Sequence, residues 1–115
     1  ITRRAYLKTN RDTALKFFRG YSEGLQRFTR DKAAAKKIIQ KYTRDSAEDI
    51  IEATYQYAVD YVVRPPYPNR EGIVETLKLS QNPEARKANP DQFLDMSIVK
   101  TLEDQGFLRQ IGMQK

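Results

Sequence analysis

Apolar residues recur along this chain at steps of three and four, which is the period of an α-helix. Near the N-terminus, Phe17 widens an apolar stripe formed by Ala14, Phe18, Tyr21, Leu25 and Phe28. Asn10 and Asp12 precede the stripe, where an N-cap residue and a negative first-turn charge are favoured. The pattern predicts a long amphipathic helix over residues 10–29.

A second stripe follows after a very short connection. Asp31 is placed to cap a helix over residues 31–43, whose apolar side contains Ala34, Ala35, Ile38, Ile39 and Tyr42. The connection at Thr29 and Arg30 is too short for a linker. We therefore expect these two helices to form an antiparallel or steeply angled pair.

A third helix is predicted over residues 46–63, beginning at Asp45 or Ser46. Its expected buried stripe is Ile50, Ile51, Thr54, Ala58, Tyr61 and Val62. Pro65 and Pro66 then prevent the helix from continuing, because proline lacks the backbone N–H and its ring clashes with the preceding turn.

Two shorter helices complete the pattern. Asn69 is placed to cap a helix over 70–81, in which the inward residues are Ile73, Val74 and Leu77. Asp95 is placed to cap a helix over 95–105, with Gly106 as its C′ residue and a stripe of Ile98, Val99 and Leu102. Residues 1–107 therefore form a single all-α segment of about five helices, and residues 108–115 are expected to be a flexible tail.

Two local features leave alternatives open. The segment Ile1–Tyr6 reads as the end of a strand or the start of a helix. Gly20 and Gly24 lie four residues apart within the first long helix, where each costs up to about 1 kcal/mol relative to alanine. Close packing against another helix is the favoured explanation for this pair, and a functional hinge is the other.

Composition excludes several kinds of chemistry. The 115 residues include no cysteine and no histidine, so thiolate zinc sites, disulfides, cysteine nucleophiles and histidine triads are all excluded. No glycine-rich phosphate loop, signal peptide or apolar run of about 20 residues is present in the sequence. We predict no enzyme activity and identify no catalytic, cofactor-binding, metal-binding or ligand-binding residue.

Charge is distributed unevenly. The chain carries a net charge of +6, with the basic residues concentrated before position 45 and an acidic excess after it. This division suggests either pairing within the molecule or a basic binding face. The clearest basic run is Arg27, Arg30, Lys32, Lys36, Lys37, Lys41 and Arg44.

The alternative function drawn from this run is a free-standing helical module that binds nucleic acid or an acidic partner. No nucleic-acid-binding motif accompanies it, so a solvated face is the favoured interpretation. The acidic groups Glu48/Asp49/Glu52 and Glu103/Asp104 lie on polar helix faces, and we expect them to be surface residues rather than acid–base pairs.

Several sequence segments, taken in order along the chain, resemble a known protein family. They span Asn10–Leu25, Asp31–Thr43, Ala53–Tyr57, Pro66–Gly72 and Phe93–Phe107, which together cover nearly the whole chain. These segments are similar to the C-terminal portion of ABC-transporter substrate-binding proteins of the nitrate/sulfonate/taurine type and their thiamine-precursor-binding relatives.

The resemblance implies a fragment of a two-lobed α/β fold of the periplasmic-binding-protein type. Such a protein lies in the periplasm or at the outer side of the membrane, holds a small anionic or thiamine-precursor-like ligand between its lobes, and delivers it to an ABC permease. Its other partner would be the remainder of the binding protein, which carries most ligand contacts. Because its apolar stripes would then lack their cover, we expect the isolated chain to self-associate.

Overall fold

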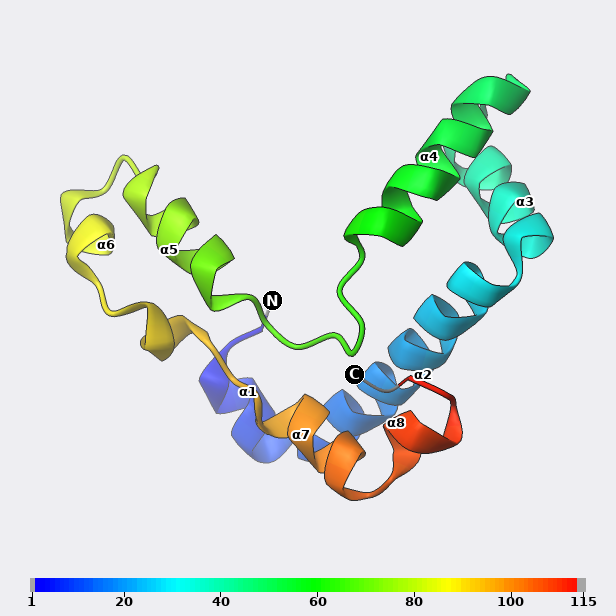
Figure 1. Cartoon of the computed structure of the whole chain (residues 1–115). Coiled ribbons are helices and arrows are strands. Elements are labelled where there is room, and N and C mark those ends of the chain that lie inside the picture. Colours follow the sequence, from blue (N-terminus) through cyan, green and yellow to red (C-terminus); the bar gives the residue numbers. More distant parts are fainter. Residues whose placement is uncertain (1, 114–115) are drawn as a thin grey trace.

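The computed structural model describes residues 2–113, and every regular element in that range is helical. The chain order is α1 (Arg4–Thr9), α2 (Arg11–Arg30), α3 (Lys32–Thr43), α4 (Glu48–Tyr61), α5 (Arg70–Lys78), α6 (Pro83–Lys87), η1 (Pro90–Phe93), α7 (Ser97–Asp104) and α8 (Phe107–Gln110). The predicted all-α character is thereby confirmed for these residues. Figure 1 shows how the elements are arranged in space.

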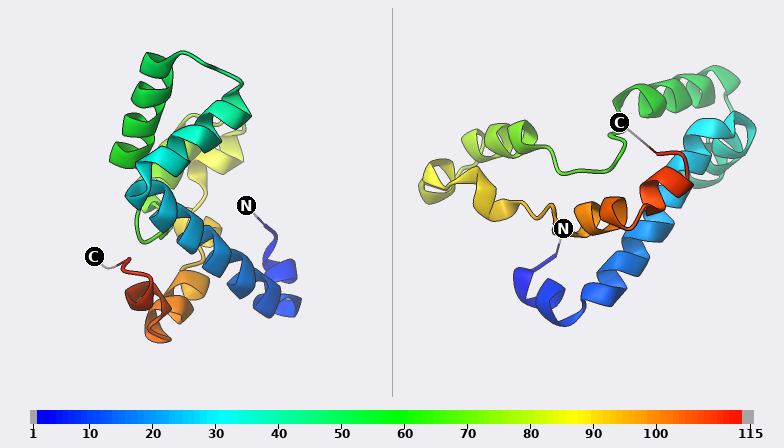
Figure 2. Two further views of the ribbon diagram at one scale, coloured as in Figure 1. Left: turned by 90° about the vertical axis from the view of Figure 1, so that its right-hand side faces the viewer. Right: turned by 60° about the horizontal axis from the view of Figure 1, so that its bottom comes forward.

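The helices form an open shape with two diverging arms (Figure 1). α3 and α4 make one arm, α5, α6 and η1 make the other, and α1, α2, α7 and α8 form the base, as the further views in Figure 2 confirm. The radius of gyration is 16.9 Å, whereas a compact domain of this length has about 13 Å. The chain therefore leaves much more surface uncovered than a closed fold would.

Two separate clusters of buried side chains hold the molecule together. The first cluster joins α7, α8 and the chain end and contains Val99, Leu102, Phe107, Leu108 and Met113, against which Leu15, Phe18 and Leu25 of α2 pack. The second joins α3 and α4 and contains Ala35, Ile39, Ile51 and Tyr55, with Phe28 beside it. α5, α6 and η1 contain no buried residue, so their arm lies outside both clusters.

Several predicted helix ends are confirmed by their hydrogen bonds. Asp31 Oδ1 accepts the Ala34 N–H at 3.0 Å, and Asn69 Oδ1 accepts the Gly72 N–H at 3.2 Å. Gly106 has φ +73°, the left-handed conformation that ends α7 as expected of a C′ glycine.

The prediction that the Asn10 side chain caps α2 is wrong, although α2 does begin directly after Asn10. Asn10 makes no side-chain cap for α2, and its Nδ2 instead donates to the Tyr6 carbonyl at 3.2 Å. The reason is that Asn10 also ends α1, whose last carbonyls need donors. Of the two alternatives for the first residues, the helix is the one that forms, while Ile1 itself lies outside the described residues.

The expected tail at 108–115 differs from the structure, which adds the short helix α8. Leu108 and Met113 are only 2% and 3% exposed, and the Met113 N–H donates to the Leu108 carbonyl at 2.8 Å. The turn at Gly106 directs these apolar side chains back onto α7, where their burial is favourable. Residues 114 and 115 lie outside the described range.

The predicted apolar stripe of α2 is confirmed except at Tyr21. Ala14 is buried, and the other stripe residues that pack against the two clusters are Phe18, Leu25 and Phe28. Tyr21, in contrast, is exposed. Ser22 and Gln26 are buried as well although both are polar, and Gln26 Nε2 donates to the Gly112 carbonyl at 2.8 Å. The apolar surface of α2 is thus wider than the area its described neighbours cover.

Candidate functional site

The most distinctive surface of the molecule is the uncovered side of α2. We call Phe17, Gly20, Tyr21 and Gly24 the α2 apolar face, because their spacing places them on one side of the helix. Phe17 is 65% exposed and Tyr21 is 45% exposed, and their rings stack with centroids 6.2 Å apart. Adjacent exposed aromatic rings contribute to an apolar patch, and large patches of this kind mark interaction surfaces.

The two glycines belong to this face. Apart from its chain neighbours and the adjacent backbone of α2, a Cβ atom added to Gly20 or Gly24 would meet no described atom within 4 Å. The predicted close packing at this pair is therefore wrong for the chain as described, because no helix of the chain lies over them. They instead leave open space next to the stacked rings of Phe17 and Tyr21.

Three recesses run along this side of α2. A groove of about 570 Å³ lies between α2 and α3 and is lined by Tyr21, Gly24, Phe28 and Ile38 among others. A recess of about 420 Å³ lies where the loop after α4 meets α2, and a third of about 320 Å³ lies between α1 and α2. Tyr21 lines the first two and Phe17 the last two, so neighbouring recesses share an aromatic side chain.

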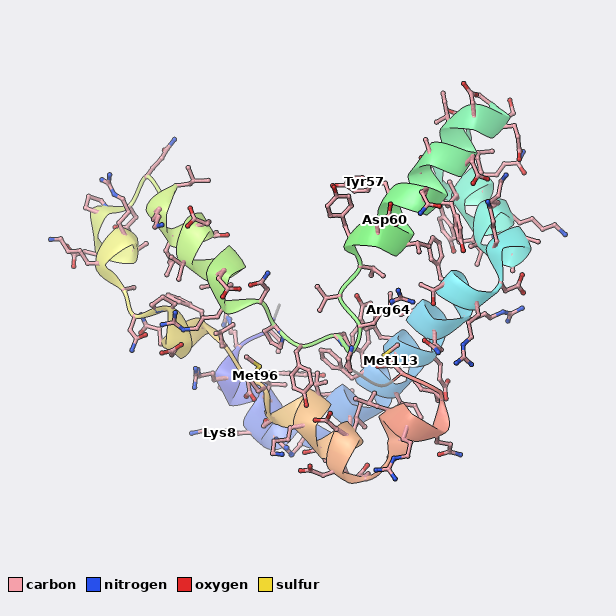
Figure 3. All side chains as sticks on the ribbon, viewed as in Figure 1. Lys8, Tyr57, Asp60, Arg64, Met96 and Met113 are labelled. Carbon is pink, nitrogen blue, oxygen red and sulfur yellow. The ribbon has the colours of Figure 1, made fainter. Side chains whose placement is uncertain are left out.

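Tyrosines from α4 extend this surface. Tyr57 and Tyr61 are 66% and 71% exposed, with ring centroids 4.6 Å apart. Tyr61 lines the same recess as Phe17 and Tyr21. Figure 3 shows Tyr57 projecting from α4 toward the space between the two arms. The sequence placed Tyr61 in a buried stripe, so its exposure corrects that expectation.

The basic run is divided by ion pairs within the molecule. Lys32 Nζ lies 2.5 Å from Glu52 Oε1, and Lys36 binds both Glu48 and Glu52. The hydrogen bond to Glu48 is the main reason that the pKa of Lys36 is raised, and the bond from Lys32 is the main reason that the pKa of Glu52 is lowered. Two of the seven basic side chains therefore form ion pairs between α3 and α4, so part of the basic run is paired with acidic residues of the same molecule.

Further arginines connect the base helices, in contacts that no local sequence signal predicts. Arg11 donates to Thr101 Oγ1 at 3.0 Å. Arg19 donates to Gln105 Oε1 at 2.6 Å, and its guanidinium lies 4.7 Å from the centre of the Phe107 ring. The basic N-terminal half therefore uses part of its charge to hold the C-terminal helices.

The acidic residues singled out from the sequence are dispersed among different partners. Glu103 accepts a hydrogen bond from the Tyr67 hydroxyl, and Asp104 lies 3.2 Å from Lys100 Nζ. Within residues 2–113, no group of three acidic side chains is arranged to hold a metal ion. None of the helices described there has the length and apolar character needed to cross a bilayer.

Comparisons with protein-family models, curated proteins and solved structures find no match to this chain. The inference of function therefore depends on the surface described above and on the sequence segments that resemble a known family.

Proposed function

We propose that this chain is the helical C-terminal part of a solute-binding protein of an ABC importer. The observation that carries the proposal is the row of apolar recesses along α2, in which Phe17 and Tyr21 remain 65% and 45% exposed. A helical layer with one such surface fits the role of a scaffold that packs onto other parts of a larger fold. The choice of protein family rests on the order of the sequence segments that resemble it.

The amount of exposed surface supports this role. The chain exposes 8717 Å², whereas a compact protein of its 13.4 kDa mass exposes about 6,500 Å². The difference is large enough for an extensive contact with the sheet-bearing lobes. In this proposal the chain is one piece of a two-lobed α/β fold, with its arms and the α2 side against those lobes.

The function of the whole protein is then capture and delivery rather than catalysis. The lobes close around a small anionic or thiamine-precursor-like ligand, and the closed form is recognised by a membrane permease. Most ligand contacts belong to the lobes, and the α-helical part supports them. Such a protein works in the periplasm or at the outer face of the membrane.

The test is to read the coding DNA upstream of Ile1 and to express the longer product. The proposal requires roughly 200 preceding codons that specify alternating strands and helices, because two α/β lobes need that length. The longer protein should gain thermal stability with a member of a panel of nitrate, alkyl sulfonates, taurine and pyrimidines. An upstream stop codon within a few residues would refute the proposal.

The alternative of a nucleic-acid module is less well supported. Lys32 and Lys36 are already paired with acidic residues of α4, although Arg27, Lys37 and Lys41 remain exposed. Non-specific binding of DNA weakens steeply with salt, so the assay is a mobility shift with duplex DNA at low and high salt. We expect no salt-dependent shift, and a clear one would favour this alternative.

A further inference from the structure

We propose that an acidic amphipathic helix docks in the groove between α2 and α3, with its apolar side in the groove and its carboxylates on Arg27 and Lys37. This inference rests on the proposed function for the source of the helix, which belongs to the lobes that meet the α2 side. It goes further because it names the chemistry of the segment that this groove accepts.

The groove has the size and the lining that suit an apolar helix face. Its volume is about 570 Å³, and it lies between two helices. Gly24 of α2 and Ala34 of α3 line it, and such small side chains allow another helix to approach closely. Tyr21 and Ile38 line it as well and are 45% and 48% exposed, so both have apolar surface left to bury. An amphipathic helix laid into an apolar groove is a common mode of recognition.

Charge selects the kind of helix. Arg27 and Lys37 line the groove from α2 and α3, and both side chains are exposed. None of the described lining residues is acidic, and neither cation forms an ion pair with a described residue. Glu23, the acidic residue one turn before Arg27, lines a different recess. Carboxylates at the edges of a docked helix would therefore meet two cations, whereas basic residues there would be repelled.

Another side of α3 already binds a helix of this kind. There Lys32 and Lys36 pair with Glu52 of α4, and Ile39 packs with Ile51 in the second core cluster. α4 thus places an apolar side on α3 and its carboxylates on the lysines of α3. The α2–α3 groove presents the same combination of apolar surface and cations, and no described helix occupies it.

The experiment measures peptide binding to the chain by fluorescence anisotropy. The probes are three designed peptides of about 18 residues, which is long enough for a helix to form. All three carry leucine along one side, and the positions that flank this side are glutamate in the first peptide, glutamine in the second and lysine in the third. At low salt the glutamate peptide should bind about fivefold tighter than the glutamine peptide, and the lysine peptide should bind most weakly.

Two double variants locate the charged contact. Arg27→Gln with Lys37→Gln removes both cations from the groove, so the affinities of the three peptides should come within about twofold of each other. Lys8→Gln with Arg86→Gln lowers the net charge equally but lies on α1 and α6, so this control should keep the preference for glutamate. All four side chains are exposed, and far-UV circular dichroism should show that both variants fold as the wild type does.

Ile38→Gln tests the apolar part of the contact. The substitution removes apolar surface from the groove and retains a good helix former, so all three peptides should bind about fivefold more weakly. Leu79→Gln, at an 84% exposed position at the end of α5, is the matched control and should leave the affinities unchanged.

Equal affinities for the three peptides overturn the inference, and so does the absence of glutamate-peptide binding at about 200 μM chain. A preference for glutamate that survives Arg27→Gln with Lys37→Gln overturns it as well, because the contact would then lie elsewhere. If the chain alone forms dimers that this double variant dissociates, a second copy occupies the groove instead. Each of these results leaves the importer proposal standing, because the upstream coding sequence decides that separately.

Discussion

The Tyr67 hydroxyl donates a hydrogen bond to the Glu103 carboxylate, which ties the loop between α4 and α5 to α7. The Tyr67 ring also packs against the first core cluster. The bond to Glu103 is the main cause that raises the pKa of Tyr67 to about 12. The loop that separates the two arms is thus fixed to the base at a titratable contact.

Because of this contact, we expect Tyr67 to ionise at a higher pH than an ordinary tyrosine. Ultraviolet titration of tyrosinate should contain a component with a midpoint near 12, which Tyr67→Phe removes and Glu103→Gln shifts downward. Because the pKa is raised in the folded state, the contribution to stability is fully present below pH 10 and is lost as pH rises through about 12. An unchanged titration curve in Glu103→Gln would show that the carboxylate does not hold this phenol.

Acid should weaken the α3–α4 contact through Glu52. Its pKa is lowered from 4.5, chiefly by the hydrogen bond from Lys32, so the stabilisation is present above pH 4.5 and is lost as pH falls through the folded-state value. The melting temperature of Glu52→Gln should lie below the wild-type value at pH 7, and the two should converge as the pH is lowered. Glu84→Gln, at an exposed site on α6, is the control and should follow the wild type throughout.

The first core cluster should be sensitive to the loss of one side chain. Leu102 is fully buried, and Leu102→Ala should lower the free energy of unfolding by about 2–5 kcal/mol, since the deletion leaves a cavity among its neighbours. Leu79 is 84% exposed, so Leu79→Ala should change it by less than about 0.5 kcal/mol. Urea unfolding followed by circular dichroism measures both variants, and equal losses would contradict the assigned core.

Substitution of Ser22 should stabilise the protein, in contrast to the substitution of Leu102. Among the described side chains, its buried Oγ makes no hydrogen bond. Ser22→Ala removes a desolvated hydroxyl and adds helix propensity, and we expect it to raise the free energy of unfolding by about 1 kcal/mol.

The comparison for Ser22 is the same substitution at a partnered hydroxyl. Ser97 Oγ accepts a hydrogen bond from Arg11 at 3.2 Å, so Ser97→Ala should lower stability where Ser22→Ala raises it. Chemical denaturation of the two variants measures the difference. Destabilisation by Ser22→Ala would mean that its hydroxyl is satisfied in solution.

The helices themselves could be predicted because their signals are local. The stop at Pro65 and Pro66, the caps at Asp31 and Asn69 and the turn at Gly106 depend on residues within a few positions of each other. Short helices such as α8 were missed because four residues carry too little periodicity. Burial of Met113 depends on a turn that folds the chain back, which periodicity does not encode.

Local sequence patterns are enough to show that the chain is helical, where its main helices lie and that cysteine and histidine chemistry is absent. The tertiary structure decides that Ser22 and Gln26 are buried and that Tyr21 is not, because the segments that cover α2, such as α7 and Gly112, come from the other end of the sequence. An apolar stripe shows that a side chain favours burial without showing what will cover it. For that reason the sequence alone does not show that the α2 apolar face stays exposed, and the candidate site is built on this face.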